Sequence, residues 1–194
     1  MTEVLLFHHI QGLTDGVVAF ADELRASGHT VHTPDLFDGR TFDTIGKGLA
    51  YAKELGEAPD AKATSAADAL PEALVYAGFS WGVGSAQRLA QTRAGARGAL
   101  LYEACYPITG EYAFGPWPDG VPVQIHGKED DQFFAHEGDI DAARELVATV
   151  GPELGALFVY PGGEHLFLDR SLPTYDAEAA ALVTQRTLDF LSVL

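Results

Sequence analysis

The chain has 194 residues, 47% of them hydrophobic and 21% charged, which is enough for one domain with a hydrophobic core. Acidic residues outnumber basic ones 28 to 12, and the formal charge of −16 argues against binding to nucleic acid or to an anionic membrane surface. Only one cysteine is present, Cys105, so an intrachain disulfide is excluded and a reducing, cytoplasmic location is expected.

Short apolar runs alternate along the chain with longer stretches of helical spacing. The first half predicts, in order, a strand at Val4–His9, a helix at Asp15–Ser27, a strand at His29–Thr33 and a helix at Thr44–Leu55. The stretch that follows, to about Ala69, is rich in Pro, Asp, Ala and Ser and gives no clear prediction. The opening strand is too short for an export signal or a membrane span.

The second half continues the same alternation. It predicts a strand at Leu74–Gly78, a helix at Val83–Arg93, strands at Gly98–Glu103 and Val121–His126, a helix at Gly138–Val150, a strand at Ala156–Tyr160 and a closing helix at Ala177–Leu194. Aliphatic strands joined through helices predict an α/β fold, a three-layer sandwich around a mostly parallel sheet of about six to seven strands. No repeat or linker interrupts the pattern, so residues 1–194 are expected to form a single domain.

One segment between a predicted strand and a predicted helix has a motif that is typical of a catalytic serine. Gly78-Phe79-Ser80-Trp81-Gly82 matches G-x-S-x-G, a turn that holds a serine in a strained backbone conformation while small neighbours let strand and helix approach. We therefore expect Ser80 to be a nucleophile and the Trp81 amide to face a developing oxyanion. The alternative is the glycine-rich turn of a nucleotide-binding fold, but Gln87 stands where G-x-G-x-x-G requires its third glycine.

A serine hydroxyl needs a neighbouring base, and the base needs a carboxylate to orient it. His165 is the expected base, because its glycine-rich loop follows the last predicted strand and should reach the same sheet edge as Ser80. Asp130, in the turn after the preceding strand, is the expected acid. Spacing alone leaves its neighbours Glu129 and Asp131 open as alternatives. The chain order of serine, acid and histidine is that of α/β hydrolases.

Other residues are expected around this centre. A second oxyanion amide should come from the loop after the first strand, with Ile10 as its donor. His9 is expected to line the site and His8 to pack in the core; no further ligands complete a zinc set, so no metal is expected. Four aromatic residues either cover the sheet edge or form the wall of a substrate pocket: Tyr106, Tyr112, Phe114 and Trp117.

With these motifs the chain resembles the dienelactone hydrolase family over nearly its whole length. The resemblance rests on Val4–Gly12, Gly28–Phe37, the Ser80 turn, His126–Asp130 and Tyr160–Tyr175. The last is the most specific, since Tyr160–Phe167 resembles the family's histidine loop. The resemblance implies a three-layer α/β sandwich, here without the leading antiparallel strands, that hydrolyses lactones or small esters without a cofactor.

The chain also departs from the family's best-known members. They use a cysteine nucleophile where this chain has Ser80, and they place a glutamate near the nucleophile where this chain has His9. The arginine that binds the substrate carboxylate shortly after their catalytic histidine is not matched, since Arg170 comes one place late. These departures point away from dienelactone itself as the substrate.

The sequence thus predicts a serine hydrolase that cleaves a small-molecule ester or lactone through an acyl-enzyme. A thioesterase or peptidase with the same three residues, and a binding module that retains the fold without catalysis, remain as alternatives. The sequence indicates no oligomeric state.

Overall fold

The computed structural model describes all of residues 1–194 and contains one six-stranded sheet. Its strands are β1 (Glu3–Phe7), β2 (Thr30–His32), β3 (Val75–Phe79), β4 (Gly98–Tyr102), β5 (Val123–Lys128) and β6 (Gly155–Tyr160). They lie in the order β2-β1-β3-β4-β5-β6, and every neighbouring pair is parallel. The predicted α/β fold is confirmed, with six strands in the sheet.

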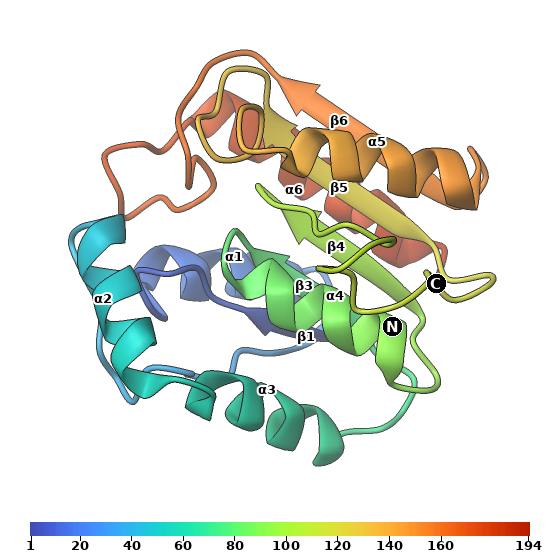
Figure 1. Cartoon of the computed structure of the whole chain (residues 1–194), viewed down its shortest axis with the longest axis horizontal. Helices are drawn as coiled ribbons and strands as arrows, with labels where there is room; N and C mark the ends of the chain where they lie inside the picture. Colours follow the sequence, from blue (N-terminus) through green and yellow to red (C-terminus); the bar gives the residue numbers. More distant parts are fainter.

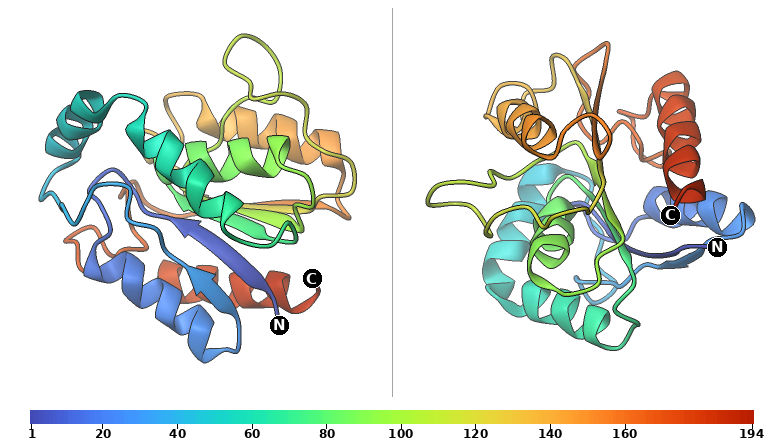
Figure 2. Two further views of the ribbon diagram at one scale, coloured as in Figure 1. Left: turned by 90° about the horizontal axis from the view of Figure 1, so that it is seen from below. Right: turned by 90° about the vertical axis from the view of Figure 1, so that its right-hand side faces the viewer.

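Helices cover both faces of the sheet and form the outer layers (Figures 1 and 2). They are α1 (Asp15–Ala26), α2 (Ile45–Leu55), α3 (Ala58–Asp68), α4 (Gly82–Thr92), α5 (Asp139–Val150) and α6 (Ala177–Ser192). Side chains of α1 and α6 pack into one apolar core, and side chains of α3, α4 and α5 pack into a second core on the opposite face. None of the helices combines the length and apolar character that a membrane span requires.

Helix α3 is the element that hydrophobic periodicity does not reveal. Its buried positions are small, Pro59, Ala63 and Ala67, spaced four residues apart on one face. Such a face packs closely against its neighbours, but it carries none of the large apolar side chains that mark an amphipathic helix. The sequence features that could have predicted this helix are the four-residue spacing of small residues and the proline in the first turn.

The strand order fixes where a ligand can enter. The chain passes from β1 outward to β2 and then returns to place β3 on the other side of β1. The loops that leave the carboxyl ends of β1 and β3 therefore diverge to opposite faces, and an open parallel sheet binds ligands in the crevice between such loops. Phe7 pairs with Gly78 at this edge, so the loop after β1 lies beside the Ser80 turn.

Candidate active site

Ser80 lies in a sharp turn between β3 and α4. Its φ of 47° is in the left-handed region that a serine rarely adopts. A Cβ atom on Gly78 would lie 2.5 Å from the Gly82 carbonyl oxygen, and one on Gly82 would lie 2.4 Å from the carbonyl oxygen of His8. Any side chain at either position would collide with these carbonyl oxygens, which explains why the G-x-S-x-G pattern has glycine at both.

A continuous line of hydrogen bonds leads from Ser80 into the protein. The Ser80 hydroxyl lies 2.7 Å from Nε2 of His165, and Nδ1 of His165 lies 2.6 Å from Oδ2 of Asp131. The Asp131 side chain is fully buried, while the imidazole retains a small exposed area. The other oxygen of Asp131 accepts a hydrogen bond from the Phe133 amide at 2.9 Å, which fixes the carboxylate in place.

The expectation that Asp130 orients His165 is wrong. The Asp130 side chain is 78% exposed, and its carboxylate bonds to His136 at 2.8 Å. The backbone amides of Glu129 and Asp130 still bond to the carbonyl groups of Tyr160 and Gly162, but both residues lie in a turn that follows β5. In this turn the Asp130 side chain faces solvent, and the side chain of the next residue, Asp131, faces the imidazole.

Negative charges surround His165. Burial by itself would lower the pKa of this imidazole, but the hydrogen bond that His165 donates to Asp131 and the nearby carboxyl groups of Glu103, Asp131 and Asp139 outweigh burial and raise the pKa above the ordinary value. The imidazole is therefore a stronger base than a free histidine, and its protonated form is stabilised where a proton from Ser80 would arrive.

Two backbone amides near Ser80 have no hydrogen-bond acceptor within the protein. These are the amides of Ile10, in the loop after β1, and of Trp81, which directly follows Ser80. Both residues line the same cavity as Ser80 and His165. Two free amide donors in the cavity of a serine hydroxyl can hold an oxyanion there.

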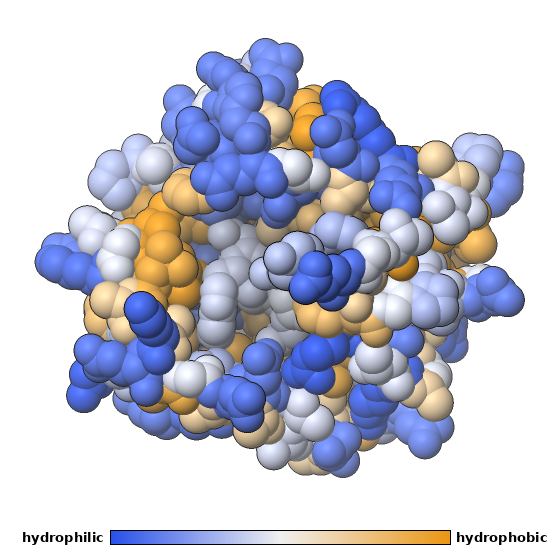
Figure 3. Space-filling model, in the orientation of Figure 1, coloured by the Kyte–Doolittle hydropathy of each residue, from blue (hydrophilic) through white to orange (hydrophobic).

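The cavity has a volume of about 310 Å³, at the lower end of the range for small-molecule pockets. It is lined by Ile10, Ile45, Leu49, Ser80, Trp81, Glu103, Ala104, Tyr106, Phe133, Glu137, Asp139 and His165. In the space-filling view a hydrophobic patch over α2, which contributes Ile45 and Leu49, borders a hollow toward the centre of the face (Figure 3). The wall is thus apolar on the α2 side and acidic on the side of β4 and α5.

Only one of the four predicted aromatic residues lines this cavity, Tyr106. Phe114 packs against the Tyr106 ring, with ring centroids 5.3 Å apart, and lines a neighbouring hollow. Tyr112 is 76% exposed, whereas Trp117 is buried and donates its indole N–H to the Val121 carbonyl. The loop between β4 and β5 therefore covers the sheet edge more than it forms a substrate wall.

The expectation that His9 lines the site is also wrong. Its ring is buried, and Nε2 donates to the Asp169 carboxylate at 2.7 Å. Asp169 further accepts hydrogen bonds from Thr14 and Ser171. These bonds tie the loop after β1 to the segment that follows His165, so His9 supports the position of the Ile10 amide without meeting substrate. His8 is buried in the core as expected, and burial lowers its pKa to about 4.

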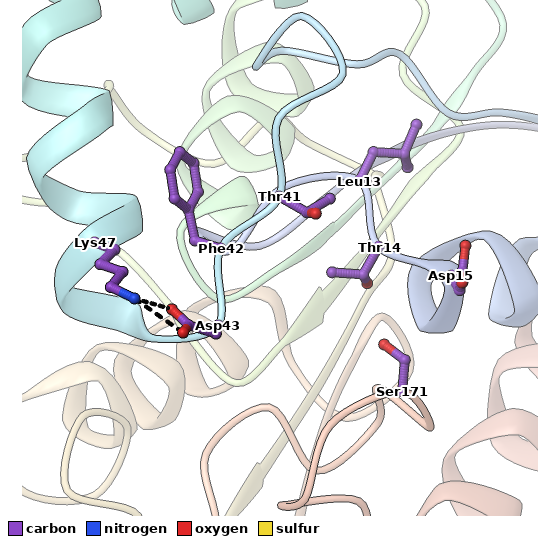
Figure 4. A pocket seen from close by; sticks show the side chains of 8 residues that line it. All are labelled: Leu13, Thr14, Asp15, Thr41, Phe42, Asp43, Lys47 and Ser171. Carbon is purple, nitrogen blue, oxygen red and sulfur yellow. Dashed lines mark hydrogen bonds and ion pairs between the residues drawn. The ribbon is translucent and has the colours of Figure 1, made fainter.

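A second hollow, of about 600 Å³, opens beside the N-terminus of α2 (Figure 4). Its lining is mostly polar, and Lys47 is paired with Asp43 at 2.7 Å. It contains Ser171 but no histidine, and it shares no residue with the Ser80 cavity. It therefore lacks a nucleophile–base pair. No group of three or more His, Cys, Asp or Glu side chains is arranged to hold a metal ion.

Glu103 is a buried carboxyl group that the sequence analysis did not single out. One of its oxygens accepts a hydrogen bond from the Phe167 amide at 2.7 Å, and the other is buried without any partner. Burial raises the pKa of Glu103 from its usual 4.5 to about 7. The only signal in the sequence was a charged residue at the end of an otherwise aliphatic strand.

This raised pKa predicts a pH-dependent stability. The folded protein holds the Glu103 proton more tightly than the unfolded chain does, so the free energy of unfolding should fall as pH rises from about 4.5 to about 7. We expect Glu103→Gln to reduce that fall by up to about 3 kcal/mol, because glutamine has no charge to bury. Urea unfolding of both proteins at pH 5 and pH 8 measures the difference, and equal falls in the two proteins would contradict it.

Solved structures with the same architecture include several hydrolases. A dienelactone hydrolase-like promiscuous phosphotriesterase from metagenomic libraries is 18% identical, with a TM-score of 0.73 over 100% of this chain and 87% of that one. Thermogutta terrifontis esterase 2, phosphoramylated by tabun, is 16% identical, with a TM-score of 0.66 over 99% and 83% of the two chains. A Thermus thermophilus protein is also 16% identical, with a TM-score of 0.65 over 99% and 88%. These likenesses show a shared fold.

Among curated proteins, no sequence matches the chain. The family model described as the dienelactone hydrolase family matches residues 1–194, which confirms the resemblance carried by the motifs. The chain therefore belongs to the dienelactone hydrolase family and is a hydrolase of ester bonds.

Proposed function

We propose that this protein is a serine esterase that cleaves small esters or lactones through an acyl-enzyme, with Ser80 as nucleophile, His165 as base and Asp131 as orienting acid. The observation that carries the proposal is the unbroken line of short hydrogen bonds from the Ser80 hydroxyl through His165 to a buried carboxylate. Such a line supports transfer of the hydroxyl proton to the imidazole.

The first half of the reaction acylates Ser80. Its oxygen forms a bond to the substrate carbonyl carbon while His165 Nε2 takes the hydroxyl proton, and the Ile10 and Trp81 amides donate to the oxyanion. When the tetrahedral intermediate collapses, the bond to the leaving alkoxide breaks and His165 returns the proton to it. An alcohol departs, or, from a lactone, the hydroxyl end of the same molecule is freed.

The second half releases the acid. A water molecule gives a proton to His165 and attacks the acyl carbon, and the Ser80 oxygen leaves and regains its proton from His165. A cavity of about 310 Å³ accommodates a short acyl chain or a small ring, which favours small esters over long-chain lipids. The single, buried cysteine supports a cytoplasmic location.

Covalent labelling tests the proposal. One structural neighbour is an esterase phosphoramylated by tabun, which makes a phosphorus electrophile a suitable probe. We expect a fluorophosphonate to add one adduct, located on Ser80 by mass spectrometry, and the unlabelled protein to hydrolyse 4-nitrophenyl acetate with an initial burst of nitrophenol. Absence of both label and turnover would favour a binding module, while preferential turnover of thioesters or peptides would replace the esterase assignment.

A further inference from the structure

The wall of the Ser80 cavity carries acidic groups and no permanent positive charge. Glu103, Glu137 and Asp139 line it, whereas no lysine or arginine does. Arg170, the arginine nearest in sequence to the expected family position, is engaged elsewhere, and so is Arg40. Arg40 lies over the ring of Tyr51, and Arg170 pairs with Glu23 at 3.8 Å. A carboxylate on the substrate would therefore meet like charges without a counter-ion.

One of these acidic groups has a buried oxygen without a partner. The second carboxyl oxygen of Glu103 is buried and accepts no hydrogen bond from the protein. A buried carboxylate oxygen without a partner is costly, and nearby positive charge offsets that cost, so such an atom beside a cavity indicates a cationic ligand. Glu103 directly follows β4, whereas Glu137 precedes α5 and Asp139 begins it, so the acidic groups come from two separate parts of the chain.

Aromatic rings complete the wall. Trp81, Tyr106 and Phe133 line the same cavity, and the Phe133 ring centroid lies 4.6 Å from that of His165. Aromatic faces together with carboxylates form the environment that binds organic ammonium groups, since both present negative potential to a weakly hydrated cation. A neutral carbon group of the same shape would gain only the apolar contact with the rings and would lack the electrostatic attraction to the rings and carboxylates.

We propose that the cavity selects small esters that carry an organic ammonium group near the scissile bond, ahead of neutral esters of the same shape and well ahead of anionic ones. The inference rests on the proposed function of Ser80 and names its substrate class. A site for substrate carboxylates would have the opposite charge preference, and the lack of an arginine at the expected family position already disfavours such a site.

Three acetate esters test this order at low ionic strength: acetylcholine, its neutral isostere 3,3-dimethylbutyl acetate, and anionic 3-acetoxypropanoate. We expect kcat/KM for acetylcholine to exceed that for the isostere by about tenfold, and the anionic ester to fall about tenfold below the isostere. Equal values, or the opposite order, would overturn the inference, while turnover of the neutral ester would leave the esterase assignment standing.

Matched variants separate the local effect from the overall charge of −16. Glu137→Gln combined with Asp139→Asn should reduce the preference for acetylcholine over its isostere to about threefold or less. Asp141→Asn combined with Glu145→Gln removes the same charge from exposed positions of α5 outside the cavity and should keep the wild-type preference. If both double variants lose the preference for acetylcholine to the same extent, the preference comes from the overall negative charge of the protein, and the proposed ammonium site is wrong.

A second readout covers the case in which Ser80 is labelled but none of the three esters is hydrolysed. Choline should then slow fluorophosphonate labelling of Ser80 more strongly than 3,3-dimethylbutanol at the same concentration. Equal protection would overturn the inference. If Ser80 is neither labelled nor active, the proposed function and this inference fall together.

Discussion

Replacing Ser80 with alanine is expected to lower kcat/KM for 4-nitrophenyl acetate by about 10⁴-fold or more and to abolish fluorophosphonate labelling. Alanine keeps the shape of the turn but has no oxygen to form the acyl-enzyme. His165 and the free amides of Ile10 and Trp81 remain, so the residual rate reports what oxyanion binding and general-base attack by water supply alone.

A second serine provides the matched control. Ser85 lies on α4, five residues beyond Ser80, and is buried, but its nearest side-chain partner is Asp60 rather than His165. Ser85→Ala should retain activity within a few-fold of wild type. Both variants should unfold cooperatively near the wild-type melting temperature. Comparable activity in Ser80→Ala and wild type would show that hydrolysis uses another group and would remove the basis of the mechanism.

The parts of the site that could be predicted from sequence are those specified by local chemistry. The turn around Ser80 is defined within five residues. Gly78 is required because the backbone of Gly82 approaches it, and Gly82 is required because the His8 carbonyl beyond β1 approaches it. His165 could be predicted because a parallel sheet brings the loops after its strands to one edge. In both cases a short motif and the topology determine the position together.

The parts that could not be predicted depend on contacts between distant segments. His9 is removed from the cavity by Asp169, which lies 160 positions away in the chain. Ile45 and Leu49 enter the cavity because α2 packs against the loop after β1, where a Cβ on Gly48 would lie 2.0 Å from the Ile10 carbonyl oxygen. No periodicity within α2 indicates which part of the sheet edge that helix will cover.

Replacing Asp131 with asparagine is expected to lower kcat by about 10⁴-fold, whereas the same change at Asp130 should leave kcat within a few-fold of wild type. The Asp131 carboxylate accepts the Nδ1 proton of His165, which leaves Nε2 free to receive the proton of Ser80. An amide at this position can donate to Nδ1 and stabilise the wrong tautomer. Asp130 is exposed and contacts only His136, so its charge has no direct role in orienting the imidazole.

The pH dependence distinguishes this effect from simple damage to the fold. Asp131 is one of the groups that raise the pKa of His165, and a general base works only after it has lost its proton. Asp131→Asn should therefore shift the acidic limb of any remaining His165-dependent rate to lower pH, while Asp130→Asn should leave that limb in place. Rate–pH profiles of the two variants, with melting temperatures measured in parallel, provide the comparison. A large loss in Asp130→Asn with near-normal activity in Asp131→Asn would mean that the loop after β5 rearranges in the working enzyme to exchange the two carboxylates.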